Sequence, residues 1–174
     1  MISHPQTKTQ TQHIILQGGK TANRTGALFE AQIKPVLLGH NYEFVPPSEA
    51  LSAIKRGDEM SALGDKWFTS QIALERNIYK AKFRTDFFLF NAGKFPLGMH
   101  IECKWQGSAG SVDEKYVFTV LSLKALLSES VLILDGDGAR RGAVEWIKSE
   151  EKKGGRFRFF GSISQFNNWA VKNI

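Results

Sequence analysis

A short stretch near the middle of the chain, GMHIECKWQG at residues 98–107, carries side chains whose types and spacing could do chemistry. Side chains alternate along a β-strand, so Glu102 and Lys104 would share one face, about 7 Å apart at their Cα atoms. A carboxylate can ligate a divalent cation, and a neighbouring ammonium group can orient a water or stabilise an oxyanion. The solvated face of an antiparallel sheet would look the same, and on this strand alone that structural interpretation is favoured.

The same alternation divides the rest of the strand into two unlike faces. His100, Glu102, Lys104 and Gln106 form a polar face, on which His100 is expected to be exposed. Met99, Ile101, Cys103 and Trp105 form an apolar face, which is expected to belong to the core.

The preceding strand adds a second acid. Asp86 opens the apolar run of RTDFFLFN at residues 84–91, and a hairpin turning near residues 93–96 would bring it alongside Glu102. Two carboxylates on neighbouring strands repel each other and persist best where a hard cation bridges them.

The spacing of apolar residues and the positions of turn-forming residues predict the helices and strands that hold these side chains. Helices are predicted at residues 25–38, 112–127, 139–153 and 162–173, and strands at 77–83, 84–91, 99–105, 130–136 and 156–161. Expected N-caps are Thr25, Ser111 and either Ser162 or Ser164, and Pro35 should kink or shorten the first helix. Residues 48–77 give no clear pattern. The prediction is an α/β fold with a mixed sheet, in a single domain at 13–174 that follows a flexible tail at 1–12.

Composition narrows the class of protein. The 174 residues carry a net charge of +6, which favours an anionic partner, nucleic acid ahead of a membrane surface. Cys103 is the single cysteine, so an internal disulfide and a cysteine-rich zinc site are excluded. No apolar run reaches the roughly 18 residues that span a bilayer, and the N-terminus lacks the apolar core of a signal peptide, so a cytoplasmic protein is expected.

The stretch TDFFLF…HIECKWQ resembles the signature of the PD-(D/E)XK nuclease superfamily, with Asp86 as the first acid and Glu102-Cys103-Lys104 as the E-x-K element. The resemblance implies a restriction-endonuclease-like αβββαβ core, a mixed sheet flanked by helices, that hydrolyses phosphodiester bonds with Mg²⁺, for which Mn²⁺ could substitute. It also implies that Asp86, Glu102 and the Cys103 carbonyl ligate the metal, while Lys104 activates the attacking water. One departure is Thr85, which stands where many members have proline.

The resemblance extends to Glu30 in TGALFE, because members often carry a glutamate on the first core helix. There it would hold a metal-bound water or a second ion, and Gln106 would help to orient Lys104 or the phosphate. On the residues alone, Glu30 falls on the face with Ile33 and Leu37, and a capping or solvent-edge glutamate remains an equal alternative.

Basic residues near this centre predict contacts to DNA phosphates, although a solvated surface role is the alternative for each of them. They are Arg84, Lys115, Arg140, Arg141, Arg156 and Arg158. The sequence therefore predicts a metal-dependent DNA endonuclease, and a homo-oligomer is expected because cleavage of both strands calls for two active sites. The alternative is a non-catalytic DNA-binding protein on the same fold.

Two other motifs are set aside. HIILQGGKT imitates a phosphate-binding loop, but Ile14 stands where that loop needs a glycine five positions before Gly19. DGDG at residues 135–138 imitates part of a calcium loop but lacks the later glutamate, and a turn after a buried strand explains it better.

Overall fold

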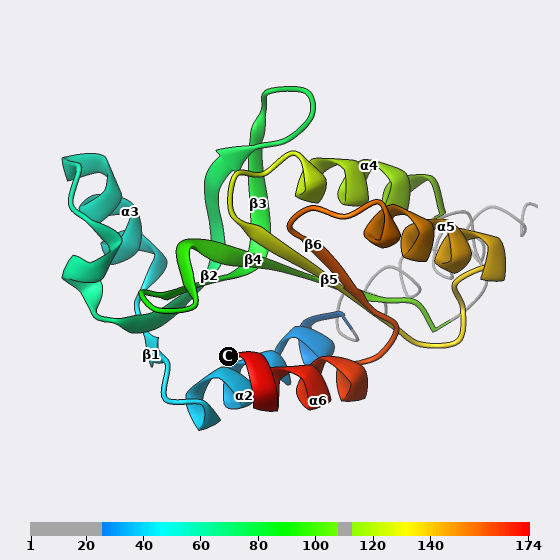
Figure 1. Ribbon diagram of the computed structural model, residues 1–174, viewed down its shortest axis with the longest axis horizontal. Coiled ribbons are helices and arrows are strands. Elements are labelled where there is room, and N and C mark those ends of the chain that lie inside the picture. The colour runs from blue at the N-terminus through cyan, green and yellow to red at the C-terminus, as the bar shows by residue number, and fades with distance from the viewer. Residues whose placement is uncertain (1–25, 108–112) are drawn as a thin grey trace, which may run out of the picture.

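The computed structural model describes residues 26–107 and 113–174 (Figure 1). The predicted tail at 1–12 and the predicted N-caps Thr25 and Ser111 lie outside the described residues. The extent of the single domain stays a prediction.

Helices and strands follow one another in the order predicted for the core. The elements are α2 (Ile33–Gly39), β1 (Glu43–Phe44), α3 (Pro47–Arg56), the 3-10 helix η1 (Met60–Leu63), β2 (Lys66–Arg76), β3 (Lys82–Asn91), β4 (Phe95–Trp105), α4 (Asp113–Lys124), β5 (Glu129–Asp135), α5 (Arg141–Lys152), β6 (Phe157–Phe160) and α6 (Ile163–Asn173). The segment from α2 through β2, β3, β4 and α4 to β5 forms the αβββαβ core. Ser162 caps α6 by accepting a hydrogen bond from the N–H of Gln165 (3.2 Å), which selects it over Ser164.

All strands join one six-stranded sheet in the order β1-β2-β3-β4-β5-β6. The pairs β2–β3 and β3–β4 are antiparallel, and the other three pairs are parallel, so the predicted mixed sheet is confirmed. Because β4 and β5 run parallel, Trp105 and Asp135 bring their carboxyl ends to the same end of the sheet. We call this the site end.

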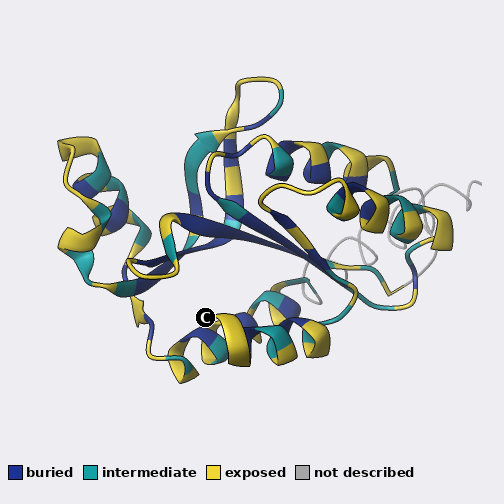
Figure 2. Ribbon diagram, viewed as in Figure 1, coloured by how far each residue is buried: buried dark blue, intermediate teal, exposed yellow. Residues whose placement is uncertain are grey.

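Helices cover both faces of the sheet (Figure 1). Residues 26–30, α2 and α6 pack on one face through a cluster that includes Phe29, Ile33 and Phe166. Helices α4 and α5 pack on the other face, and α3 packs beside β2 and β3. Figure 2 shows the buried residues concentrated in the strands and on the inward sides of the helices. Within the described ranges, no helix is both long and apolar enough to cross a membrane.

The first predicted helix is present in two parts, because residues 26–30 and α2 are separated by a turn at 31–32. Pro35 does not cause this break, which precedes it. The proline instead lies in the first turn of α2, where a backbone N–H would have no intrahelical partner and its loss costs little.

Residues 66–76, which showed no clear pattern, form the strand β2, and the strand predicted at 77–83 is wrong except for its last two residues, which begin β3. A tight turn at 77–81 joins β2 to β3, organised by Asn77, whose side-chain oxygen accepts hydrogen bonds from the N–H groups of Tyr79 (2.9 Å) and Ala81 (3.1 Å). The asparagine supplies turn geometry inside a stretch whose composition resembles a strand.

Candidate active site

Strands β3 and β4 separate at Asp86. Their antiparallel pairs run as far as Phe87↔Ile101. Beyond this pair the N–H of Cys103 donates to Oδ2 of Asp86 at 2.7 Å, so a carboxylate takes the place of a backbone acceptor. The N–H and C=O of one residue in an extended strand point to the same side, so the Cys103 carbonyl also faces the gap between the two strands.

Glu102 and Lys104 are paired on β4 beside this gap. Nζ of Lys104 donates to Oε1 of Glu102. The Glu102 side chain is 9% exposed, and its second oxygen, Oε2, has no hydrogen-bond partner among the described residues. A buried polar atom without a partner costs about 1–3 kcal/mol, so Oε2 is a candidate ligand atom.

Glu30 and Gln71 reach the same place from two other elements. The side-chain amide of Gln71, on β2, donates to Oε2 of Glu30 and to Oδ1 of Asp86, both at 3.1 Å. The Glu30 carboxylate therefore lies with the other acids and not at a helix cap. Its proposed role remains a prediction.

Burial and repulsion from a neighbouring acid shift the pKa values of Glu30 and Glu102. Burial raises the pKa of Glu102 to about 7, against the opposing effect of Lys104 and with a further rise from Asp86. Burial also raises the pKa of Glu30, and Asp86 adds to the rise. Burial alone would lower the pKa of Lys104, but Glu102 outweighs it and the net pKa is raised. Burial and repulsion between the acids thus oppose ionisation of Glu30 and Glu102, and a bound cation would favour their charged forms.

The polar face of β4 is buried at His100 and Glu102 and only partly exposed at Lys104, so its interpretation as a solvated face is wrong. His100 is fully buried, contrary to the expectation that it is exposed. Its Nδ1 shares a hydrogen bond with Oγ1 of Thr85 (2.8 Å), and its Nε2 lies 3.5 Å from Oε1 of Glu75. The outer part of the β2–β3 hairpin, which carries Thr85 and Glu75, covers this face and fixes β3 just before Asp86.

The apolar face of β4 is buried except at its end. Met99, Ile101 and Cys103 lie in the core, but Trp105 is 42% exposed because β4 ends there. Burial raises the pKa of the Cys103 thiol, which therefore stays protonated. The predicted contribution of Cys103 to a metal site concerns its backbone carbonyl alone.

Gln106 follows β4 and is fixed through its backbone to the turn after β5. Its N–H donates to the carbonyl of Asp135 (2.9 Å), and its carbonyl accepts from the N–H of Gly138 (2.8 Å). Gly136 has φ +95°, and a Cβ there would lie 2.3 Å from the Gln106 oxygen, so the turn requires glycine. The role of the Gln106 side chain remains a prediction.

Four of the predicted DNA-contacting residues lie on elements next to the acids. Arg84 is exposed on β3 two residues before Asp86, and Lys115 is exposed in the first turn of α4. Arg140 and Arg141 precede or begin α5 and form exposed ion pairs with Asp113 (3.2 Å) and Glu145 (2.6 Å), respectively. Such pairs contribute little to stability and can exchange for phosphate contacts.

The other two predicted contacts lie elsewhere. Arg156 lines a hollow with Phe95 and Glu129, where β4 and β5 begin, so it occupies the end of the sheet opposite the site end. The Arg158 guanidinium lies 5.7 Å from the ring centre of Trp169 on α6.

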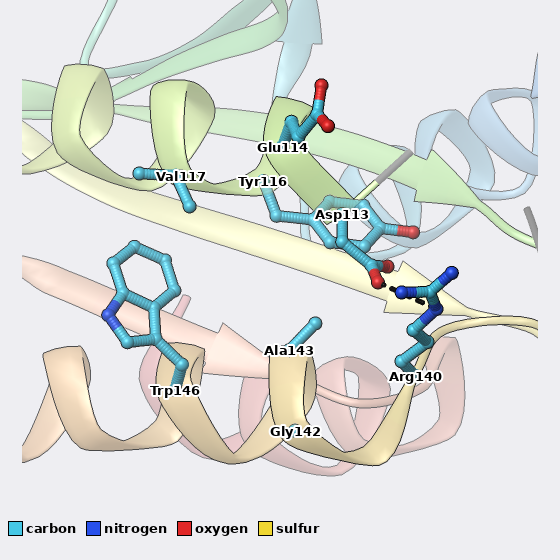
Figure 3. Close-up of a pocket in the computed structure, with 8 residues that line it drawn as sticks. All are labelled: Asp113, Glu114, Tyr116, Val117, Arg140, Gly142, Ala143 and Trp146. Carbon is cyan, nitrogen blue, oxygen red and sulfur yellow. Dashed lines mark ion pairs between the residues drawn. The ribbon is translucent and has the colours of Figure 1, made fainter. Parts of the chain in front are cut away.

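An apolar groove of about 420 Å³ lies between α4 and α5 (Figure 3). Trp146 lies at one end in that view and the Asp113–Arg140 ion pair at the other. Burial raises the pKa of Tyr116, which lines the groove, with Asp113 adding to the rise and Lys104 opposing it.

Gln71 is the residue of this cluster that sequence reasoning missed. Trp67 and Ile72 pack in the same cluster although an odd number of positions separates them, which a regular strand does not allow. This change of phase is visible only in the packing, because alternation in the sequence would place Ile72 on the face of Phe68, which packs in a different cluster.

A family model described as the PD-(D/E)XK nuclease superfamily domain matches residues 21–173. No curated protein and no solved structure matches the chain. The matched residues include all the acids of the cluster together with Lys104.

Proposed function

Because the chain belongs to the PD-(D/E)XK nuclease superfamily, we propose that it is a metal-dependent DNA endonuclease that hydrolyses phosphodiester bonds. One observation carries the proposal. The Asp86 carboxylate accepts the N–H of Cys103, 17 residues further along the chain, and so lies beside the Glu102–Lys104 pair. Two carboxylates and an ammonium group at a fork between strands suit chemistry on a phosphate.

The chemistry of the donors fits a hard divalent cation such as Mg²⁺ or Mn²⁺. Asp86, Glu102 through its unpartnered Oε2, and the Cys103 carbonyl would offer oxygen ligands. Among the described residues no group of three or more His, Cys, Asp or Glu side chains is arranged to hold a metal ion, so the proposed set needs the backbone carbonyl. When bound, the ion would polarise the phosphate and neutralise its charge.

Lys104 keeps its proton in this environment, because Glu102 outweighs the effect of burial on its pKa. An ammonium group donates hydrogen bonds and cannot accept a proton, so its proposed role is to orient the attacking water and stabilise charge on phosphorus. Glu30 would hold a further water at the site, and Gln106 would help to orient the phosphate.

The proposed substrate is DNA, held by phosphate contacts from Lys115, Arg140 and Arg141 around the site end and from Arg84 on β3. The net charge of +6 favours such a partner at long range. A homodimer would supply the two active sites that cleavage of both strands needs.

Plasmid cleavage with Mg²⁺ tests the proposal. Asp86→Asn keeps an oxygen that can accept the Cys103 N–H, and Lys104→Met keeps the length of the side chain, so both variants should fold. Each should lose about 100-fold or more of the cleavage rate, as removal of one charge-stabilising group does in other enzymes. Asp58→Asn and Lys55→Met change exposed residues at and after the end of α3 and serve as matched controls.

Full activity in either site variant would reject the assignment. The alternative, a non-catalytic DNA-binding protein, predicts no cleavage by the unmodified protein with any divalent metal. It also predicts DNA binding that weakens steeply with salt.

A further inference from the structure

The backbone of Gln71 adopts a conformation that its residue type disfavours. Its φ is +51°, in the left-handed region that few residues with long side chains occupy. It lies on β2 between the regular pairs Ser70↔Phe87 and Ile72↔Thr85 and is itself unpaired in this register. Strain of this kind persists where surrounding contacts impose it, and it occurs often at functional sites.

The strained backbone directs the Gln71 amide between two acids. Its Nε2 carries two hydrogens and donates to Glu30 and Asp86, both at 3.1 Å. The two carboxylates repel, since Asp86 contributes to the raised pKa of Glu30. A neutral double donor reduces this repulsion without adding a positive charge that a metal ion would have to displace.

We propose that Gln71 is a positioning residue that holds the Glu30 carboxylate beside Asp86. The inference rests on the proposed nuclease function and deepens it. Glu30 belongs to the helical segment 26–30, a separate element, and Gln71 links it to the strand that carries Asp86. A hollow of about 220 Å³, lined in part by Glu30, Lys34 and Gln71, leaves this pair open to water and substrate.

Two substitutions separate the side chain from the strained backbone. Gln71→Met keeps the length of the side chain and removes the amide, and should lower kcat for plasmid cleavage about 10–100-fold with KM little changed. Gln71→Gly should lower kcat similarly but raise Tm by about 2 °C, because glycine accepts a positive φ without strain. Asn41, with φ +61° in the turn after α2, supplies the control, since Asn41→Gly should leave kcat unchanged.

Two measurements do not depend on cleavage. In the metal-free protein, a double-mutant cycle of Gln71→Met with Glu30→Met should show coupling of about threefold in the unfolding equilibrium constant. Calorimetry with Mn²⁺ should show weaker binding to Gln71→Met than to the unmodified protein.

Unchanged kcat in Gln71→Met, with cleavage lost in Asp86→Asn, would overturn the positioning role and leave the proposed function standing. Tighter Mn²⁺ binding by Gln71→Met would also overturn it, because the amide would then obstruct the cation. Full cleavage by Asp86→Asn would reject the proposed function, and the metal-free coupling to Glu30 would still report the contact.

Discussion

Replacement of Glu75 by glutamine should destabilise the protein at neutral pH and much less in acid. The Glu75 carboxylate accepts the N–H of Leu127 (2.6 Å) and the hydroxyl of Ser128 (2.6 Å), and lies 3.5 Å from Nε2 of His100. These contacts fasten the outer β2–β3 hairpin to the turn between α4 and β5. Glutamine keeps one acceptor oxygen and sets an NH₂ group against the remaining donors.

The size of the effect follows from the pKa of Glu75. Burial alone would raise it, but the His100 ring, the Ser128 hydroxyl and the Leu127 N–H outweigh burial and lower it from 4.5 to about 2. Linkage converts this lowering into about 3 kcal/mol at neutral pH. The side chain is 24% exposed, and the His100 contact is long for a hydrogen bond, so screening reduces the stabilisation to about 1–2 kcal/mol.

The sign of the pH dependence is fixed, because the pKa is lower in the folded state. The stabilisation is fully present above the unfolded pKa of 4.5 and is lost as the pH falls through about 2. Urea unfolding should therefore show Glu75→Gln about 1–2 kcal/mol less stable at about pH 7, and less than half of that difference at about pH 3.

Glu43→Gln provides the control, because Glu43 is exposed on β1. It should change the free energy of unfolding by less than about 0.5 kcal/mol at both pH values. A Glu75→Gln difference of the same size at both pH values would refute the reasoning, since it could not then arise from ionisation of the carboxylate.

Two further predictions concern packing and DNA binding. Gly98→Ala should lower the free energy of unfolding by about 2–4 kcal/mol in chemical denaturation, because Gly98 has φ +82° and a Cβ there would lie 2.0 Å from the Phe88 ring. Gly142→Ala is the control and should be neutral or stabilising, because no atom lies within 4 Å of the added Cβ. Equal effects of the two substitutions would contradict this account. DNA binding should depend less on salt in Arg84→Met, with the slope of log K against log salt reduced by about 1. Arg156→Met changes a residue at the opposite end of the sheet from the site end and should leave the slope unchanged. Equal slopes in the two variants would place the bound DNA elsewhere.

The acids of the site could be predicted because their positions follow from strand alternation and from the family signature. Asp86 and Glu102 both adjoin apolar strand residues, so a hairpin between the two strands brings both acids to one place. The helices α5 and α6 were predictable because each has a clear apolar side, whereas α4 also exposes Val117 and Leu121 and lacks such a division.

The irregular parts of the sheet could not be predicted, because local pattern does not encode them. Gln71 interrupts the period of β2, and its backbone conformation depends on two acids that are distant in sequence. His100 has an alternation typical of a solvated face, but the hairpin that covers it folds back through a turn at Asn77 that the composition conceals. Both errors come from tertiary contacts that override local preference.

The hairpin that follows Gln71 and precedes Asp86 is a two-stranded ribbon beyond the last β3–β4 pair, and such a ribbon is barely stable alone. Its order depends on α4, against which Tyr79 stacks through Phe118 at 5.5 Å between ring centres. Asp86, at the base of this ribbon, therefore takes its position partly from contacts that the ribbon makes with α4, with His100 and with the turn before β5. The pairing of β3 with β4 does not reach Asp86, because it ends at Phe87.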